Sequence, residues 1–219
     1  MTESDLAHTF DKLQARLDPR LRQHGFRKHG RTYNRSTSDG LTHVIGFQMG
    51  RFDPPGTMHI PGLKENLYGR FTVNLGVYVP EVARHHGGGE AKSVVQDANC
   101  CIRTRLGRKG DTERWWTISD SESLAAEIAE RLQNEALRFF QRFENRDQIL
   151  GELQAAADTT DLMASAPPRI VSAIIRWQRG ERDEAQRLLT DQARDPTRDP
   201  RHSAYVSELA RRLGVEITS

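Results

Sequence analysis

The sequence has little of what usually identifies a function class. It contains two cysteines among 219 residues, Cys100 and Cys101, and they are adjacent. Neighbouring residues of a strand point to opposite faces, so these two are not expected to form a disulfide, and a disulfide framework is excluded. No run of about 18 apolar residues occurs, as a membrane span needs, and the N-terminus MTESDLAHTFDKL lacks the apolar segment of a signal peptide. We therefore expect a cytoplasmic protein with no membrane partner.

An excess of charge of one sign is also missing. Lysine and arginine total 32 while aspartate and glutamate total 30, which gives a formal net charge of +2. A nearly neutral chain has no overall field that would attract nucleic acid or an anionic membrane, so only a local patch could do so. Hydrophobic residues make up 36% of the chain, and its length suits one α+β domain with a small appendage.

Catalytic signatures are absent as well. The sequence holds no GxSxG nucleophile elbow, no phosphate-binding loop, no dinucleotide fingerprint and no HExxH motif. Its eight histidines match neither the i, i+4 helical pair nor the Cys/His spacing of a zinc site. The adjacent cysteines lack the CxxC partner of a redox site. We therefore expect no metal and no cofactor, and the sequence identifies no catalytic residue.

An antiparallel sheet is the clearest structural prediction. The segment 69–80, GRFTVNLGVYVP, alternates apolar residues with polar or small ones, which is typical of a strand with one buried and one polar face. The segment 42–50, THVIGFQMG, repeats this alternation, so we expect the two strands to pair. Weaker patterns predict strands at 26–35, 100–107 and 113–118, the last two joined as a hairpin. The sheet should then have about five strands.

Helices are expected before and after these strands. Apolar residues between 2 and 24 are spaced by three and four, as in a one-faced helix that Gly25 ends. Ser119 and Glu122 read as a capping box, and the pattern after them predicts a long helix from 120 to 143. The fold class predicted is α+β, an antiparallel sheet flanked by N- and C-terminal helices.

A change of composition indicates a boundary near residue 155. The stretch AAADTTDLMASA, followed by two prolines, is rich in small residues, and three amphipathic helical patterns come after it. One of them, WQRGERDEAQRLL, is similar to half of a tetratricopeptide-type helical hairpin, although no second copy occurs. We predict an α+β domain at 1–154 and an all-α C-terminal extension of about three helices at 155–219.

Several blocks of the α+β part resemble a known family. They are HGFRKHGRTYNR, HVIGFQMG, GRFTVNLGVY, CIRTRLGRKG, the pair Trp115 and Trp116, and LRFFQRF, in this order between about residues 21 and 150. Together they resemble the bacterial domain of unknown function 4304 family. The resemblance implies an α+β domain with an antiparallel sheet and carries over no catalytic residue. Relatives occur in settings that suggest interbacterial toxin and immunity systems, so it also implies an immunity-like role.

The polar face of the predicted sheet is the first candidate site. Amide and guanidinium groups on a rigid sheet can hold a carboxylate or a backbone edge by fixed hydrogen bonds. Asparagine is disfavoured within strands, so its place in a strongly β stretch favours a function, while the alternative is an ordinary solvated outer face. The candidate binding residues are Gln48, Asn74, Tyr78, Arg103 and Arg105.

The segment between the two strong strands, 51–68, is the second candidate. It is rich in proline, which makes regular structure improbable, and it carries apolar side chains that either tuck under the sheet or meet a partner. A partner would explain why so long a loop exists. Its candidate binding residues are Phe52, Met58, His59, Ile60 and Leu63.

Two basic runs are the third candidate. No acidic residue occurs from 19 to 38, and a second cluster of basic residues follows strand 100–107. If the two runs adjoin on the sheet, their surface could bind nucleic-acid phosphates. The residues concerned are Arg27, Lys28, Arg31, Arg35, Arg108 and Lys109.

These observations favour a binding module over an enzyme. We expect a non-enzymatic protein whose partner is another protein, such as a toxin that it neutralises. The first alternative is nucleic-acid binding through the Arg/Lys-rich strands. The second is a hydrolase or transferase with its site on the polar sheet face.

Overall fold

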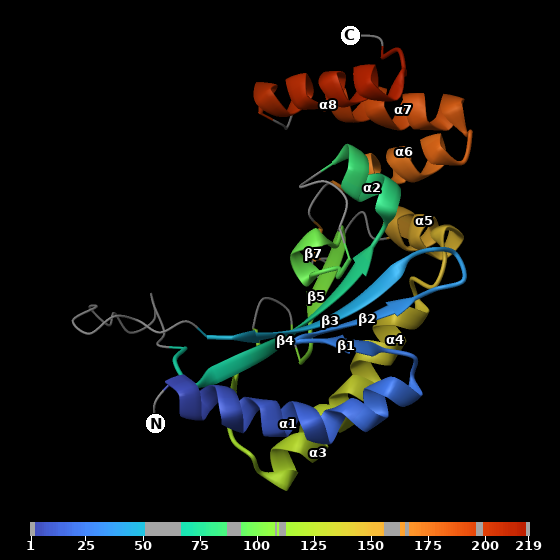
Figure 1. Ribbon diagram of the computed structural model, residues 1–219. Helices are drawn as coiled ribbons and strands as arrows, with labels where there is room; N and C mark the ends of the chain where they lie inside the picture. The colour runs from blue at the N-terminus through green and yellow to red at the C-terminus, as the bar shows by residue number, and fades with distance from the viewer. Residues whose placement is uncertain are drawn as a thin grey trace, which may run out of the picture.

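The computed structural model describes residues 3–50, 67–86, 93–107, 109, 113–155, 163–164, 167–195 and 199–217. The molecule is elongated, with the N-terminal helix at one end and the last three helices at the other (Figure 1). In chain order the elements are α1 (Glu3–Gln23), β1 (Arg27–His29), β2 (Thr32–Ser36), β3 (Thr42–Met49), β4 (Arg70–Tyr78), α2 (Pro80–His85), η1 (Asp97–Asn99), β5 (Ile102–Arg105), β6 (Trp116–Thr117), α3 (Glu122–Arg131), the π-helical turn η2 (Leu132–Ala136), α4 (Leu137–Gln141), α5 (Arg146–Ala155), β7 (Met163–Ala164), α6 (Pro168–Gln178), α7 (Arg182–Ala193) and α8 (Pro200–Leu213).

One antiparallel sheet organises the fold and confirms the α+β class. Within the described residues it has seven strands in the order β1-β2-β3-β4-β5-β7, with β6 also paired to β4. The two strong strands pair as predicted, with Ile45 opposite Leu75. The strand predicted at 26–35 is instead the hairpin of β1 and β2, because Gly30 adopts a left-handed backbone (φ 62°) that turns the chain. This hairpin and β7 explain why the sheet exceeds the expected five strands.

The predicted hairpin between 100–107 and 113–118 is wrong. Both β5 and β6 pair antiparallel with β4, and they follow one another along the same edge of it. Ile102 lies opposite Val77, and Trp116 lies opposite Phe71. The two strands are therefore consecutive parts of one interrupted strand beside β4, which the chain leaves after Arg105 and rejoins at Trp116.

The main core lies between one face of the sheet and the helices α1, α3 and α4 (Figure 1). Phe10 of α1 meets two sheet residues edge-on, with ring centroids 5.9 Å from Phe47 and 5.1 Å from Phe71. The predicted long helix is present as α3, η2 and α4, but Ser121 rather than Ser119 caps it. The Ser121 hydroxyl accepts the backbone N–H of Leu124 at 3.2 Å.

The opposite face of the sheet is also covered, so β4 lacks the solvated outer face that was the alternative to a binding site there. All residues of β4 after Arg70 are buried. The covering segment is 93–101, which lies across β2, β3 and β4. The Asn34 side chain holds it by donating to the carbonyl of Val95 at 2.8 Å and accepting its N–H at 3.0 Å.

Gly76 makes this close cover possible, and the same substitution at two glycines should have opposite effects. A Cβ at Gly76 would lie 2.6 Å from Sγ and 2.8 Å from Cβ of the buried Cys100. We expect Gly76→Ala to lower the free energy of unfolding by about 1–3 kcal/mol, as overpacking does. At Gly151 in α5 an added Cβ meets nothing within 4 Å, so Gly151→Ala should raise it by up to about 1 kcal/mol. Urea denaturation measures both, and equal effects would contradict the argument.

The C-terminal part is helical, as predicted. Helices α6 and α7 form a hairpin through Gly180, whose φ is 83°, and the indole N–H of Trp177 donates to the carbonyl of Leu213 at the end of α8 at 2.7 Å. Arg84 and His85 form the last turn of α2. Strand β7 places residues 163–164 on the sheet beside β5, and the domain division at 154 stays a prediction. In the described residues, no helix has the length and apolar character needed to cross a membrane.

Candidate functional site

Three of the five predicted sheet-face residues meet on one face of the sheet. The Asn74 amide donates to Oε1 of Gln48 at 3.0 Å and accepts the Nε–H of Arg105 at 3.0 Å. Arg105 also forms an ion pair with Glu113, and its guanidinium lies 5.6 Å from the ring centre of Trp115. Asn74 is 3% exposed, and its amide oxygen and nitrogen both bond to neighbouring side chains. The asparagine inside the strand therefore joins β3, β4 and β5.

Tyr78 and Arg103 lie apart from that network. Tyr78 is buried at the end of β4 in a small cluster with Val44, Ala83, Val95 and Cys100. Arg103 pairs with Asp97 at 3.3 Å, beside the segment that covers the sheet. Within the described residues, the sheet-face residues thus divide into three separate settings.

The predicted loop site falls outside the described residues. Phe52, Met58, His59, Ile60 and Leu63 all belong to 51–66, and their binding role stays a prediction.

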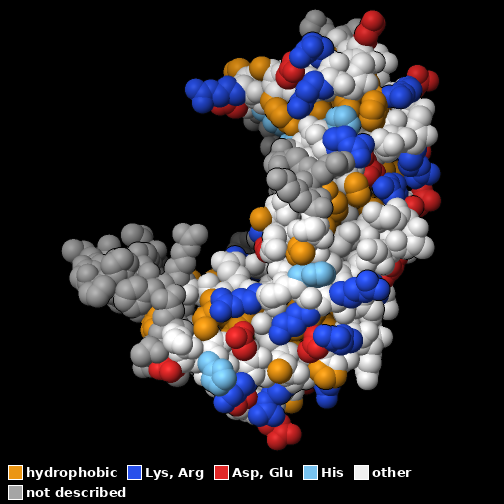
Figure 2. All heavy atoms as spheres, viewed as in Figure 1, with side chains coloured by type: hydrophobic (Ala, Val, Ile, Leu, Met, Phe, Trp, Pro, Cys, Tyr) orange, Lys and Arg blue, Asp and Glu red, His pale blue; other side chains and the backbone are white. Residues whose placement is uncertain are grey.

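The two basic runs do not adjoin. Arg27 and Lys28 lie on β1, and Arg31 and Arg35 lie at and in β2, whereas the second run follows β5 on the other side of β3 and β4. Arg35 pairs with Glu144 at 2.5 Å, Lys109 is exposed, and Arg108 is outside the described residues. On the face shown in Figure 2, basic side chains are interspersed with acidic ones. Within the described residues the sheet therefore keeps the two basic runs apart, and the nucleic-acid alternative stays a prediction.

The cysteines and the buried histidine are held in unreactive states. Cys100 and Cys101 are both buried, and burial raises the pKa of each thiol, to about 12 for Cys101. Burial and the neighbouring Arg35 lower the pKa of His43 to about 4, although its hydrogen bond to Phe143 and the charge of Glu144 act in the opposite direction. In the part of the chain that the structure describes, no group of three or more His, Cys, Asp or Glu could hold a metal ion.

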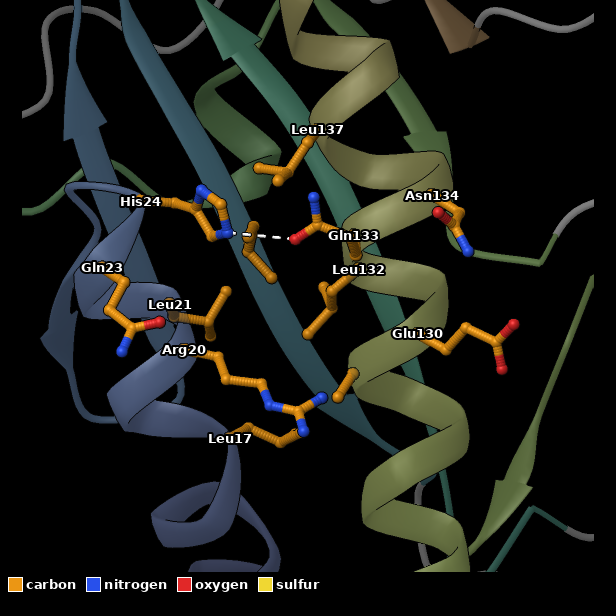
Figure 3. Close-up of a pocket in the computed structure, with 12 residues that line it drawn as sticks. Leu17, Arg20, Leu21, Gln23, His24, Glu130, Leu132, Gln133, Asn134 and Leu137 are labelled. Atoms are coloured by element: carbon orange, nitrogen blue, oxygen red, sulfur yellow. Dashed lines mark hydrogen bonds between the residues drawn. The ribbon is translucent and has the colours of Figure 1, made fainter.

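The best-formed cavity among the described residues is a cleft of about 410 Å³ between α1 and the helix α3–η2–α4 (Figure 3). We call it the α1–α3 cleft. Six apolar residues from both helices and β3 form its floor. The lining residues are Leu17, Leu21, Ile45, Ala129, Leu132 and Leu137 on the apolar side and Arg20, Gln23, His24, Glu130, Gln133 and Asn134 around the rim.

Polar contacts bracket this cleft. At one end, Arg16 pairs with Asp120 at 3.0 Å, just before α3 begins. At the other end, Nε2 of His24 and Oε1 of Gln133 are 3.1 Å apart and point toward each other (Figure 3). Between them the Arg20 side chain reaches toward the second helix, while Glu130 and Asn134 point away from α1 (Figure 3). The two helices are thus tied at both ends and leave an apolar gap between.

The π-helical turn places Gln133 at the end of the cleft. In η2 the N–H of Leu137 bonds to the carbonyl of Leu132, five residues earlier, so the helix is wider there by one residue. Such turns occur mostly as single insertions in α-helices and often at functional sites. The sequence does not set the cleft residues apart, because their leucines have the spacing of ordinary core residues.

A second hollow, of about 530 Å³, lies among α5, α6 and α7. Its walls are rich in charged side chains of both signs, including Arg176, Arg187, Glu184 and Asp191. Three of these already pair with one another, since Arg187 contacts Glu184 at 2.7 Å and Asp191 at 3.0 Å. Its polar groups are largely satisfied within the chain, so it is the weaker candidate.

Comparisons with known proteins identify a family and nothing closer. A family model described as Domain of unknown function (DUF4304) matches residues 17–142, which is more than half of the chain. Every residue that lines the α1–α3 cleft lies inside the matched range, and every residue that lines the second hollow lies outside it. No curated protein and no solved structure gives a significant match.

Proposed function

The chain belongs to the DUF4304 family, and within this domain of unknown function we propose that it is a non-enzymatic binding protein whose α1–α3 cleft takes a segment of a partner protein. The observation that carries the proposal is the cleft itself. Ligand sites are concave and mostly apolar, with a few polar groups that fix orientation. The floor of leucines and the rim of Arg20, His24 and Gln133 have this composition.

The residue types in the cleft support binding rather than covalent catalysis. None of its twelve lining residues is a serine, threonine, cysteine, lysine or tyrosine. The two that could act as nucleophiles are Glu130, which points away from α1 (Figure 3), and His24, which is hydrogen-bonded to Gln133. The imidazole of His24 is hydrogen-bonded to an amide rather than to a carboxylate that would orient it as a base.

The shape of the cleft supports a protein segment as its occupant. Two helices form its long walls, and a groove between helices is the usual seat of an amphipathic helix that inserts apolar side chains. The volume is within the range of pockets that hold a drug-sized group, which suits one or a few side chains. Neutralisation of a toxin would be one use of such a site and stays a prediction, as do the binding roles of the sheet face and of residues 52–63.

Peptide selection tests the proposal. We would select peptides from a phage-displayed random library on the wild-type protein. Their affinity would then be compared with that for the variant Gln133→Trp, whose indole should fill the open end of the cleft. Gln133 is exposed, so the indole should occupy the cleft with little cost in stability. We expect enriched peptides to bind the wild-type chain at least about tenfold more tightly than this variant, as loss of one apolar anchor predicts.

A matched variant controls for the added tryptophan. Arg138→Trp puts the same side chain at an exposed position of the same helix, outside the cleft. It should bind the selected peptides as the wild-type chain does. Selection of no peptide, or equal binding to Gln133→Trp, would overturn the proposal.

A further inference from the structure

We infer that the segment bound in the α1–α3 cleft is acidic and amphipathic, with apolar side chains on the leucine floor and a carboxylate on Arg20. This inference rests on the proposed function and adds the charge of the partner. It also gives a role to the first basic run, which the sheet does not join to the second.

Arg20 differs from its neighbours on α1. Arg16 pairs with Asp120 at 3.0 Å and Arg22 pairs with Asp18 at 2.6 Å, whereas Arg20 makes no hydrogen bond or ion pair with the described residues. Its side chain is exposed and extends over the cleft (Figure 3). A guanidinium presents planar donors that match a carboxylate bidentately, and it does so more strongly next to an apolar surface than in open water.

The charges in the lining leave the α1 side of the cleft positive. Arg20 is the one charged residue that α1 contributes to this lining. Glu130 is the one acidic residue in the lining, and it points away from α1 (Figure 3). The acidic residues next to it on the second helix are engaged elsewhere.

Those engaged carboxylates are Glu127 and Glu135. Glu127 accepts from the indole N–H of Trp116 at 3.0 Å and from Nε of Arg131 at 3.3 Å, and these bonds help to lower its pKa. Glu135 pairs with Arg131 at 2.6 Å and accepts the N–H of Gly107 at 2.8 Å. Neither offers negative charge to an occupant of the cleft, so electrostatic complementarity favours an acidic segment.

Synthetic peptides of defined charge test this inference on the full chain labelled with 15N. One peptide carries leucines at helical i, i+3, i+4 and i+7 spacing with glutamate elsewhere, and a second has the same leucines with lysine in place of glutamate. A short single-stranded oligothymidylate is the third probe. We expect only the acidic peptide to shift the backbone amide signals of the cleft residues, and to bind more weakly at high salt.

Charge reversal at Arg20 supplies the decisive comparison. We expect Arg20→Glu to lower the affinity for the acidic peptide at least about tenfold. Arg201→Glu makes the same charge change at an exposed position of α8 and should leave the affinity unchanged. Both sites are exposed, and the two variants should keep the wild-type melting temperature, which shows that the fold is retained.

The outcomes separate this inference from the proposed function. If acidic and basic peptides shift the cleft residues equally, or if Arg20→Glu binds as the wild type does, the acidic partner is wrong and peptide binding in the cleft stands. If the oligothymidylate shifts the basic residues of β1 and no peptide shifts the cleft, both are wrong and the partner is nucleic acid. If no probe shifts any cleft residue, while panning also fails, both are wrong.

Discussion

Replacing Arg146 with alanine is expected to lower the free energy of unfolding by about 3–5 kcal/mol, which is the cost of leaving a buried partner charge uncompensated. Arg146 begins α5 and donates to both carboxylate oxygens of Glu81 in α2, at 2.7 Å and 2.9 Å. The Glu81 side chain is only 3% exposed, so water cannot take the place of the guanidinium. Urea denaturation at neutral pH measures the loss.

The size of this effect follows from three chain segments that meet at one guanidinium. Besides Glu81, the Arg146 side chain donates to the backbone carbonyl of Asp39 and lies 3.1 Å from its carboxylate, in the turn between β2 and β3. The backbone N–H of Arg146 donates to the same carboxylate at 2.7 Å. The residue therefore joins the sheet, α2 and the first helix after the family-matched region.

A double variant distinguishes a lost ion pair from lost side-chain volume. Glu81→Leu combined with Arg146→Met removes both charges and keeps apolar volume in the site. We expect it to be more stable than Arg146→Ala, because no unpaired charge then stays buried. If the double variant is as unstable as the sum of the single variants, the uncompensated charge is not the cause.

The second large effect is a loss of stability in acid that depends on His43. This residue of β3 is fully buried and stacks on Phe140 with ring centroids 4.6 Å apart. Arg35 donates to its Nδ1 at 2.8 Å, so Nε2 carries the proton and donates to the carbonyl of Phe143 at 2.9 Å. Both ring nitrogens are occupied in the neutral form, and a second proton would displace the Arg35 donor.

The sign of the pH effect follows from the lowered pKa. His43 titrates near pH 4 in the folded chain and near its ordinary value of 6.5 in the unfolded chain, mainly because burial disfavours the charged ring. Between these values the unfolded state binds a proton that the folded state does not, so the free energy of unfolding falls as the pH falls. By pH 4, the difference between the two pKa values should have lowered the free energy of unfolding by about 3 kcal/mol.

Denaturation curves from pH 7 to pH 4 measure this contribution. His43→Gln keeps a donor for the Phe143 carbonyl but cannot titrate, so its stability should fall less steeply over this range than that of the wild-type chain. His29→Gln removes an exposed histidine and should leave the slope unchanged. Parallel profiles for the wild-type chain and His43→Gln would contradict the assignment.

The π-helical turn shows how a sequence signal can be present and still be missed. Ile128, Leu132, Ala136 and Phe140 are spaced by four, and all are buried. The three steps span about 3.3 turns of an α-helix, which is about a third of a turn beyond three full turns. In a regular helix the last residue of this row would therefore be rotated away from the sheet. The extra residue of η2 restores the alignment and sets Gln133 opposite His24. A constant spacing of four was therefore the available sign of the π-helical turn.

The sequence by itself determined the strands β3 and β4, the N-terminal helix ending at Gly25, and the α+β class. Apolar residues recur every second position in a strand and every third or fourth position in a helix. These periods are set by the local backbone, so a short stretch of sequence is sufficient to reveal them. The pairing of the strands also places three polar residues together, namely Gln48, Asn74 and Arg105.

Only the tertiary structure decided what covers each face of the sheet and where a cavity is left. The segment 93–101 covers the second face because Asn34 bonds to Val95 and Gly76 leaves room for Cys100. The sequence of the segment does not show that it meets these two residues. The α1–α3 cleft depends on how far two helices diverge between the Arg16–Asp120 and His24–Gln133 contacts, which join residues more than a hundred positions apart. Such long-range contacts have no local periodicity, and so the binding site that we propose became visible only in the folded chain.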